Sequence, residues 1–160
     1  MALTPLTPAQ LNTVDDLVAI GRLAVVPADQ SRALTFMRQA SDVIADLPHL
    51  TKPQNRYNLA YDACHDIGEA LLAAHGYRTM SGPGQHEAVG QFLRAVIDRP
   101  PGEQDARRFD QLRRSRNQQR YDARPVGEAD AALAAQTALG LFAAATQRGL
   151  PHPDQQHPES

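Results

Sequence analysis

Residues 57–76, YNLAYDACHDIGEALLAAHG, carry the strongest apolar periodicity of this 160-residue chain and decide its fold. Apolar and small side chains recur there every three or four positions, which places them on one face of a helix. The segment comes after Lys52-Pro53 and runs up to Gly76. We therefore expect a central core helix whose buried face carries Tyr57, Ala60, Tyr61, Cys64, Ile67, Gly68, Leu71 and Leu72.

Helical spacing recurs in five other segments, whereas no run of alternating β-branched residues bounded by turn residues is present. The sequence therefore predicts an all-α bundle of five to six helices with short loops, formed by one domain over residues 1–149. Residues 150–160 lack apolar periodicity, so we expect a disordered C-terminal tail. The five segments lie at about 8–24, at 33–47, around 89–97, at about 103–122 and in the alanine-rich stretch that stops near Gly149.

The composition is that of a soluble globular protein, because 42% of the residues are hydrophobic and 21% are charged. The formal net charge of -2 does not indicate a general attraction to nucleic acid, so any such binding must be local. Lys52 is the single lysine, and an abundance of arginine and alanine is typical of a GC-rich bacterial genome.

One cysteine, Cys64, is present, which excludes an intrachain disulfide and a cysteine-based zinc site. A reducing cytoplasm is therefore the expected location. The N-terminus lacks a basic region followed by an apolar run, and no segment approaches the roughly 20 apolar residues that span a bilayer. We expect neither secretion nor a membrane segment.

Residues 113–121, RRSRNQQRY, put four arginines into nine residues of a slightly acidic chain. An ordinary surface helix turns its apolar face inward and its charges outward. Here the arginines lie on the same helical face as the apolar residues before them, because positions three, four and seven apart share a face. We expect this helix to carry its arginines into a groove or an interface. The shared face consists of Phe109, Leu112, Arg113, Arg116, Arg120 and Arg124.

A Gly-rich turn joins the helix of residues 57–76 to Gln85-His86, and the chain continues to FDQLRRSRN at 109–117. This order resembles the HEPN superfamily, helical bundles named for higher eukaryotes and prokaryotes nucleotide-binding domains, over residues 53–146. The most specific part is Arg116-Asn117 followed by Tyr121. The family has an arginine, often a polar neighbour, and a histidine a few residues further on, so Tyr121 stands at the usual histidine position.

The resemblance implies an RNA-associated homodimer in which the motif helices of two subunits form a shared cleft for RNA. In active members the arginine and histidine cleave RNA without a metal ion, as in a toxin or defence effector. The implied partners are RNA or a nucleotide and a cognate antitoxin or nucleotidyltransferase, and no cofactor is implied. The positions carried over are Arg116, Asn117 and Tyr121 for catalysis, with Arg113, Arg120 and Arg124 for contacts to the RNA backbone.

Tyr121 is the departure that bears most on activity. Metal-free RNA cleavage uses the ribose 2′-OH as nucleophile, so it needs a proton acceptor and positive charge for the developing phosphorane. Arg116 suits the charge role, because a guanidinium holds two phosphate oxygens at once and stays protonated. Tyrosine ordinarily titrates near pH 10 and is a poor base near neutrality compared with histidine. Impaired or altered cleavage is expected.

Two other hypotheses stay open. A non-catalytic dimeric module would bind RNA, a nucleotide or a protein partner through the same arginines, in a regulatory or structural role. Alternatively, the arginines pair with carboxylates such as Asp62, Asp66 or Glu69 across the bundle and act in stability.

No metal site is expected. His65 lies at helical spacing with acidic residues of the central helix, but no second helix offers matching ligands. Only Gln85-His86-Glu87 could serve, and this segment begins a helix, where the dipole explains Glu87 and a cap or packing contact explains His86.

Overall fold

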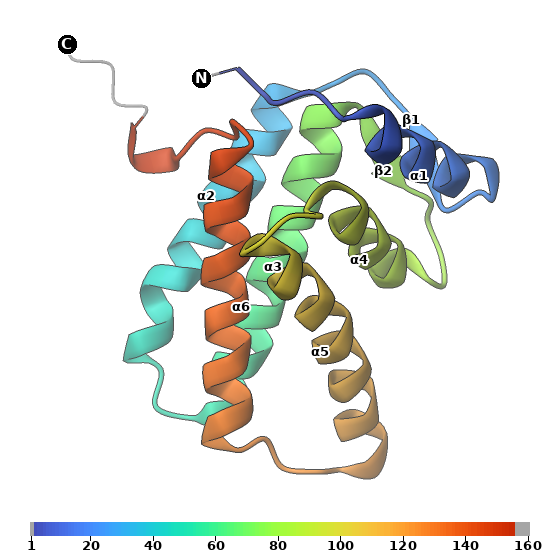
Figure 1. Cartoon of the computed structure of the whole chain (residues 1–160). Coiled ribbons are helices and arrows are strands. Elements are labelled where there is room, and N and C mark those ends of the chain that lie inside the picture. Colours follow the sequence, from blue (N-terminus) through green and yellow to red (C-terminus); the bar gives the residue numbers. More distant parts are fainter. Residues whose placement is uncertain (1, 156–160) are drawn as a thin grey trace.

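The computed structural model describes residues 2–155, and it confirms an all-α bundle. Six α-helices make up most of the described residues, and the only sheet among them has two short strands (Figure 1). The elements are α1 (Pro8–Ala19), β1 (Leu23–Val25), α2 (Gln30–Asp46), the 3₁₀ helix η1 (Leu47–His49), α3 (Pro53–His75), β2 (Tyr77–Thr79), α4 (Gln85–Val96), α5 (Gly102–Asp122), α6 (Glu128–Gln147) and the 3₁₀ helix η2 (Pro153–Gln155).

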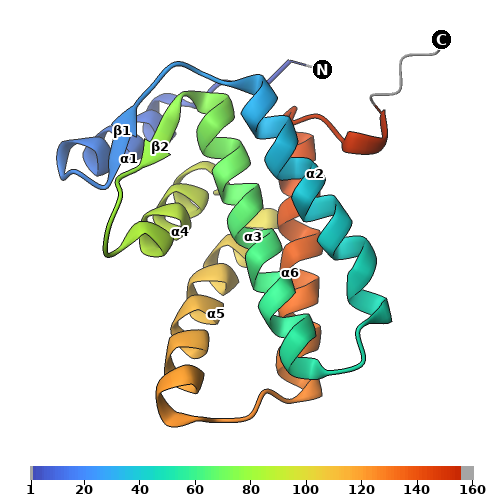
Figure 2. The ribbon, with the colours of Figure 1, turned by 180° about the vertical axis from the view of Figure 1, so that it is seen from behind.

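Helix α3 is the centre of the bundle, as its periodicity predicts. Helices α2 and α6 lie along it, and α4 and α5 cover another side, an arrangement that Figures 1 and 2 show from opposite directions. The α3 face predicted to be buried is buried, from Tyr57 at its first turns to Leu72 near its end. Gly68 lets α4 approach closely, because a Cβ there would collide with Val89 and come within 3.3 Å of Leu93 Cδ1. This contact fixes where α4 begins relative to Tyr61.

A small β-ribbon is the main difference from the predicted elements. The helix expected over 8–24 ends at Ala19, and Leu23–Val25 pair antiparallel with Tyr77–Thr79. Gly21, at φ 78°, turns the chain out of the helix, and Leu23 is then buried at 2% exposure. Three-residue strands are too short to show a period-two pattern, which is why the sequence gives no strand signal.

Leu150 and His152, at the beginning of the segment expected to be a disordered tail, contact the rest of the bundle. Leu150 is buried in the core, and the His152 ring packs edge-on against Phe142 with centroids 5.3 Å apart. Residues 153–155 form η2, while 156–160 lie outside the described residues. The segment before α1 contacts the end of α6 here, because the Thr4 amide donates to the Arg148 carbonyl at 2.7 Å.

Helix α6 is long and apolar enough to cross a membrane by length and composition, which the sequence analysis did not expect of any segment. Its small side chains pack against α2, α3 and α5, and Ala134, Ala138 and Leu141 are fully buried. A core helix of a soluble protein passes the same test, so the fold is compatible with a soluble protein.

Candidate functional site

A groove of about 560 Å³ lies where the second half of α5 faces the start of α4 and the middle of α3. We call it the arginine groove. It brings together four of the six predicted site residues and adds three that the prediction lacks. Its lining includes Arg113, Arg116, Asn117 and Arg120 from α5, Tyr61 and Asp62 from α3, and His86 from α4.

Arg116 is held against the floor of the groove. Its guanidinium carbon lies 4.6 Å from the centre of the Tyr61 ring, a cation–π contact. Its Nη1 lies 3.7 Å from Asp62 Oδ1, and its buried Nε has no hydrogen-bond partner among residues 2–155. Arg116 is therefore positioned by an aromatic face and only loosely paired through its terminal Nη1, so that its terminal nitrogens can bind an anion.

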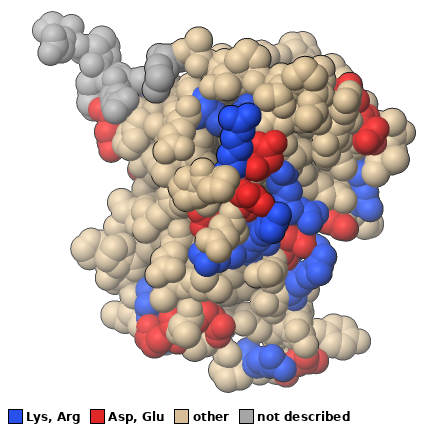
Figure 3. Space-filling view, in the orientation of Figure 1, with Lys and Arg blue, Asp and Glu red and all other residues tan. Residues whose placement is uncertain are grey.

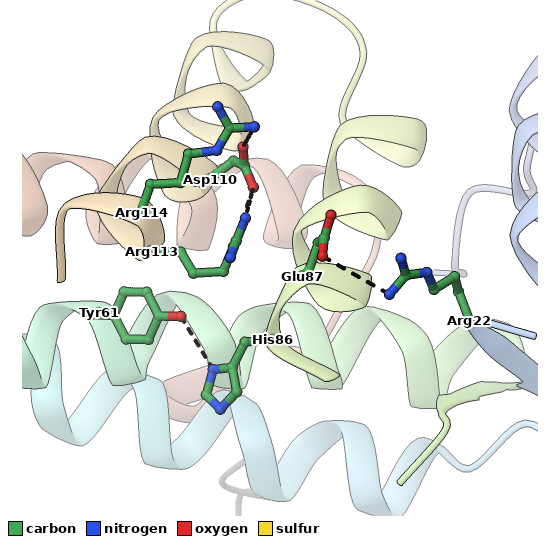
Figure 4. A network of polar contacts seen from close by, with 7 residues as sticks. All are labelled: Arg22, Tyr61, His86, Glu87, Asp110, Arg113 and Arg114. Atoms are coloured by element: carbon green, nitrogen blue, oxygen red, sulfur yellow. Dashed lines mark hydrogen bonds and ion pairs between the residues drawn. The ribbon is translucent and has the colours of Figure 1, made fainter. Parts of the chain in front are cut away.

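Arg113 is compensated more fully than Arg116. Its Nη2 lies 3.2 Å from Asp110 Oδ1, and Arg114 approaches the other carboxylate oxygen of Asp110 at 3.0 Å (Figure 4). Asp110 is only 6% exposed, so its charge needs both partners. Arg113 pairs with a carboxylate, as the stability hypothesis expects, but the partner is Asp110 one turn earlier on α5. The pair across the bundle forms between Arg116 and Asp62.

Arg120 lines the same groove, and no ion pair of Arg120 is found within the described chain. Arg124 does not continue the helical face as predicted, because α5 ends at Asp122 and Ala123 takes a left-handed conformation at φ 51°. The turn instead places Arg124 beside Arg120 in an adjoining hollow of about 320 Å³, which Arg116 also lines. The guanidinium groups of Arg116, Arg120 and Arg124 therefore lie near one another, and within the described chain only Arg116 has an ion-pair partner, Asp62 at 3.7 Å.

Tyr121 is 94% exposed and lines neither of these hollows. Within one copy of the chain it is therefore not placed beside Arg116, although four residues lie between them in sequence. Its catalytic role stays a prediction from the motif.

His86 lines the groove from the start of α4, and its ring lies next to the Tyr61 hydroxyl (Figure 4). Its Nδ1 lies 3.2 Å from Tyr61 Oη, and its ring centre lies 4.4 Å from that of His65. Partial burial lowers the pKa of His86, and Arg116 and Arg113 lower it further, whereas Asp62 raises it. The imidazole is therefore neutral near pH 7 and can accept a proton.

The two neighbours of His86 are also held uncharged. Burial, then His86 and Arg116, lower the pKa of His65 to about 4. Burial raises the pKa of Tyr61 to about 12 despite the opposing effect of Arg116. The sequence predicts only a cap or packing contact for His86. Its place after the Gly-rich turn is the one local signal for it, and only tertiary packing brings it to Tyr61.

Acidic and basic side chains alternate over the molecule, and Figure 3 shows them interleaved across the middle of one face. Near the groove, Glu87 pairs with Arg22 at 3.9 Å, and Asp62 stands at the rim with its side chain 52% exposed. The arginines that line the groove thus all lie on α5, whereas Asp62 and Glu87 line it from α3 and α4.

The acidic face of α3 does not form a metal-binding cluster in the described part of the chain, where no group of three His, Cys, Asp or Glu side chains converges. Glu69 lies 3.9 Å from His65 Nε2. Burial raises the pKa of Asp66 to about 6, with Asp62 and Glu69 adding to the effect.

Comparison of the chain with protein-family models, with curated proteins and with solved structures finds no match. Membership of the HEPN superfamily thus stays a prediction from the motif residues.

Proposed function

We propose that this chain is a HEPN-like RNA-associated protein that holds an RNA phosphate in the arginine groove. One observation carries the proposal: Arg116 is held against Tyr61, yet its only ion-pair partner in the described structure is Asp62, at 3.7 Å. An arginine kept only for stability would be expected to satisfy its donors with carboxylates, as Asp110 does for Arg113 and Arg114.

The groove suits phosphate because guanidinium groups recognise it bidentately. Arg116 and Arg120 supply two such groups, and the exposed amide of Asn117 adds a donor and an acceptor beside them. With two phosphates engaged on a single strand, log K should fall with log salt at a slope of about −1.4. This shallow slope fits a local site on an acidic protein.

Binding of a fluorescein-labelled single-stranded oligoribonucleotide, followed by anisotropy, tests the proposal. Arg116→Ala should weaken binding about tenfold or more, because a charge-assisted bidentate contact is lost. Arg107→Ala is the matched control, since Arg107 is exposed on the same helix, pairs with Glu103 and lies outside the groove. Equal affinities for the two variants would refute the groove as the binding site.

Cleavage is tested separately by incubating the protein with a mixed tRNA and mRNA pool in EDTA, with Arg116→Ala as the control. Loss of cleavage in a folded Arg116→Ala protein would support a metal-independent ribonuclease. Retained cleavage would remove Arg116 from the chemistry.

A second candidate is a non-catalytic homodimer, which the 94% exposure of the Tyr121 ring favours. An exposed aromatic side chain near the end of α5 is suited to packing on a second copy of the same helix. Tyr121→Ser should then shift the protein from dimer to monomer in sedimentation velocity. A monomeric wild-type protein would exclude this candidate.

A further inference from the structure

We infer that His86 is the group that accepts the 2′-OH proton when single-stranded RNA is cleaved in the arginine groove, and that Tyr61 is its positioning residue. The inference rests on the proposed function, because it requires the RNA phosphate to lie on Arg116. It places the base on α4, rather than at Tyr121 on α5.

Tyr61 contacts both Arg116 and His86, and this geometry supports the assignment. Tyr61 is 1% exposed and packs against Phe109 with ring centres 5.3 Å apart, so it cannot easily move. Its ring carries the Arg116 guanidinium at 4.6 Å, and its hydroxyl meets His86 Nδ1 at 3.2 Å. One buried side chain thus sets the phosphate-binding group and the imidazole relative to each other.

The 3.2 Å contact between Tyr61 Oη and His86 Nδ1 fits either ring tautomer. The proposed role requires the tautomer in which Nδ1–H donates to Tyr61 Oη, because the lone pair then lies on Nε2 and that nitrogen can accept a proton. The His65 ring on the other side of His86 is neutral and adds no competing charge. In that tautomer His86, which lines the groove, can act as the proton acceptor.

Titration of His86 is governed by groups from three helices. Tyr61, Asp62 and His65 face it from α3, Arg113 and Arg116 from α5, and Glu87 follows it on α4. The net effect of burial and the two arginines is a pKa below the ordinary 6.5 of histidine. The base is consequently available throughout the neutral range.

The step balances without another reactant. The 2′-OH gives its proton to His86 Nε2 while its oxygen bonds to phosphorus, and the bond from phosphorus to the 5′ oxygen breaks. The departing oxygen takes up one proton, passed from the imidazolium through water, so His86 returns to its neutral form. The products are a 2′,3′-cyclic phosphate and a 5′-OH, and Arg116 with Arg120 stabilises the charge on the phosphorane.

The test uses the whole chain with a labelled single-stranded oligoribonucleotide in EDTA. His86→Asn should lower the cleavage rate about 100-fold or more, the range for loss of a general base, with RNA affinity within about twofold of wild type. His49→Asn is the matched control, because His49 is an exposed histidine outside the groove. Imidazole added to His86→Ala should restore part of the rate, which no loss of structure would allow.

The pH profile and the products separate His86 from Tyr121. The wild-type rate should be level above about pH 7 and fall in acid as His86 is protonated, whereas a tyrosine base would give a rate still rising toward pH 10. Tyr61→Phe should displace the acidic limb, and Tyr121→Phe should leave it in place. A deoxynucleotide at the cleavage position should abolish cleavage, and the cyclic phosphate should appear among the products.

The possible results separate the role of His86 as a base from RNA binding in the arginine groove. Wild-type protein that binds RNA through Arg116 but does not cleave between pH 5 and 9, or His86→Asn protein that cleaves normally, overturns the role of His86 and leaves RNA binding intact. Absence of Arg116-dependent binding overturns the proposed function itself. Cleavage that needs His86 and recovers with imidazole supports both.

Discussion

Replacing Asp62 by asparagine should strengthen RNA binding, the opposite of what most site mutations do. In the free protein the Asp62 carboxylate is the partner of Arg116, at 3.7 Å, and it stands at the rim where a phosphate would arrive. Asparagine keeps the shape and removes the charge. Because the Asp62 side chain is 52% exposed, loss of the pair should change the free energy of unfolding by about 0–1 kcal/mol.

The gain in affinity follows from two electrostatic terms. At 3.7 Å in a water-like dielectric, the carboxylate and guanidinium attract by about 1 kcal/mol, part of which is lost when Arg116 turns to a phosphate. A phosphate at roughly 6 Å from the same carboxylate is repelled by about 0.7 kcal/mol. Asp62→Asn removes both costs, so a net gain of about 1 kcal/mol, or roughly fivefold in affinity, is expected.

Anisotropy with a labelled single-stranded oligoribonucleotide at about 50 mM salt measures the effect, since screening is modest there. Asp42→Asn provides the matched control, because Asp42 is exposed on α2 and does not line the groove. If Asp62→Asn binds no more tightly than Asp42→Asn while Arg116→Ala loses binding, Arg116 does not exchange Asp62 for phosphate and the reasoning is refuted.

Three further predictions concern stability. Asp66→Asn should raise the free energy of unfolding at pH 7 by about 1–2 kcal/mol. The pKa of Asp66 is raised in the folded protein, so the wild type loses stability as pH rises from about 4 to about 6, and the variant does not. Urea unfolding at several pH values should show the difference between variant and wild type disappear near pH 4. Gly68→Ala should lower the free energy of unfolding by about 1–2 kcal/mol in urea unfolding, because the new methyl group overlaps Val89 and the better helix propensity of alanine only partly compensates. A higher free energy of unfolding would contradict the close α3–α4 packing. Asp110→Asn should lower it by about 3 kcal/mol, since Arg113 loses the carboxylate that compensates it, and an unchanged melting temperature would contradict that role.

The helices were predictable because their signals are local. Apolar residues at every third or fourth position mark α3. The predicted limits 103–122 nearly coincide with α5, Gly102–Asp122. The segments that deviated are those whose structure depends on distant partners. Leu23–Val25 become a strand only because Tyr77–Thr79 lie beside them, and Leu150 is ordered because the core accepts it.

The sequence predicted only part of the candidate site. The sequence indicates a stripe of arginines and a groove or interface to receive it, because residues on one helical face are set by spacing alone. It could not distinguish Arg113, compensated by Asp110, from Arg116, which is loosely paired. That difference depends on side-chain rotamers and on which carboxylates neighbouring helices present.

By itself, then, the sequence determined an all-α bundle, its central helix and the placement of its positive charge, since each follows from neighbours within a few turns. Only the tertiary structure decided that His86 and Arg116 meet at Tyr61 and that Tyr121 faces solvent. Tyr61 and His86 are 25 residues apart on different helices. No local pattern encodes such a meeting, because it depends on how closely α4 and α5 pack on α3. The lack of a side chain at Gly68 and the buried Phe109 ring allow that close packing.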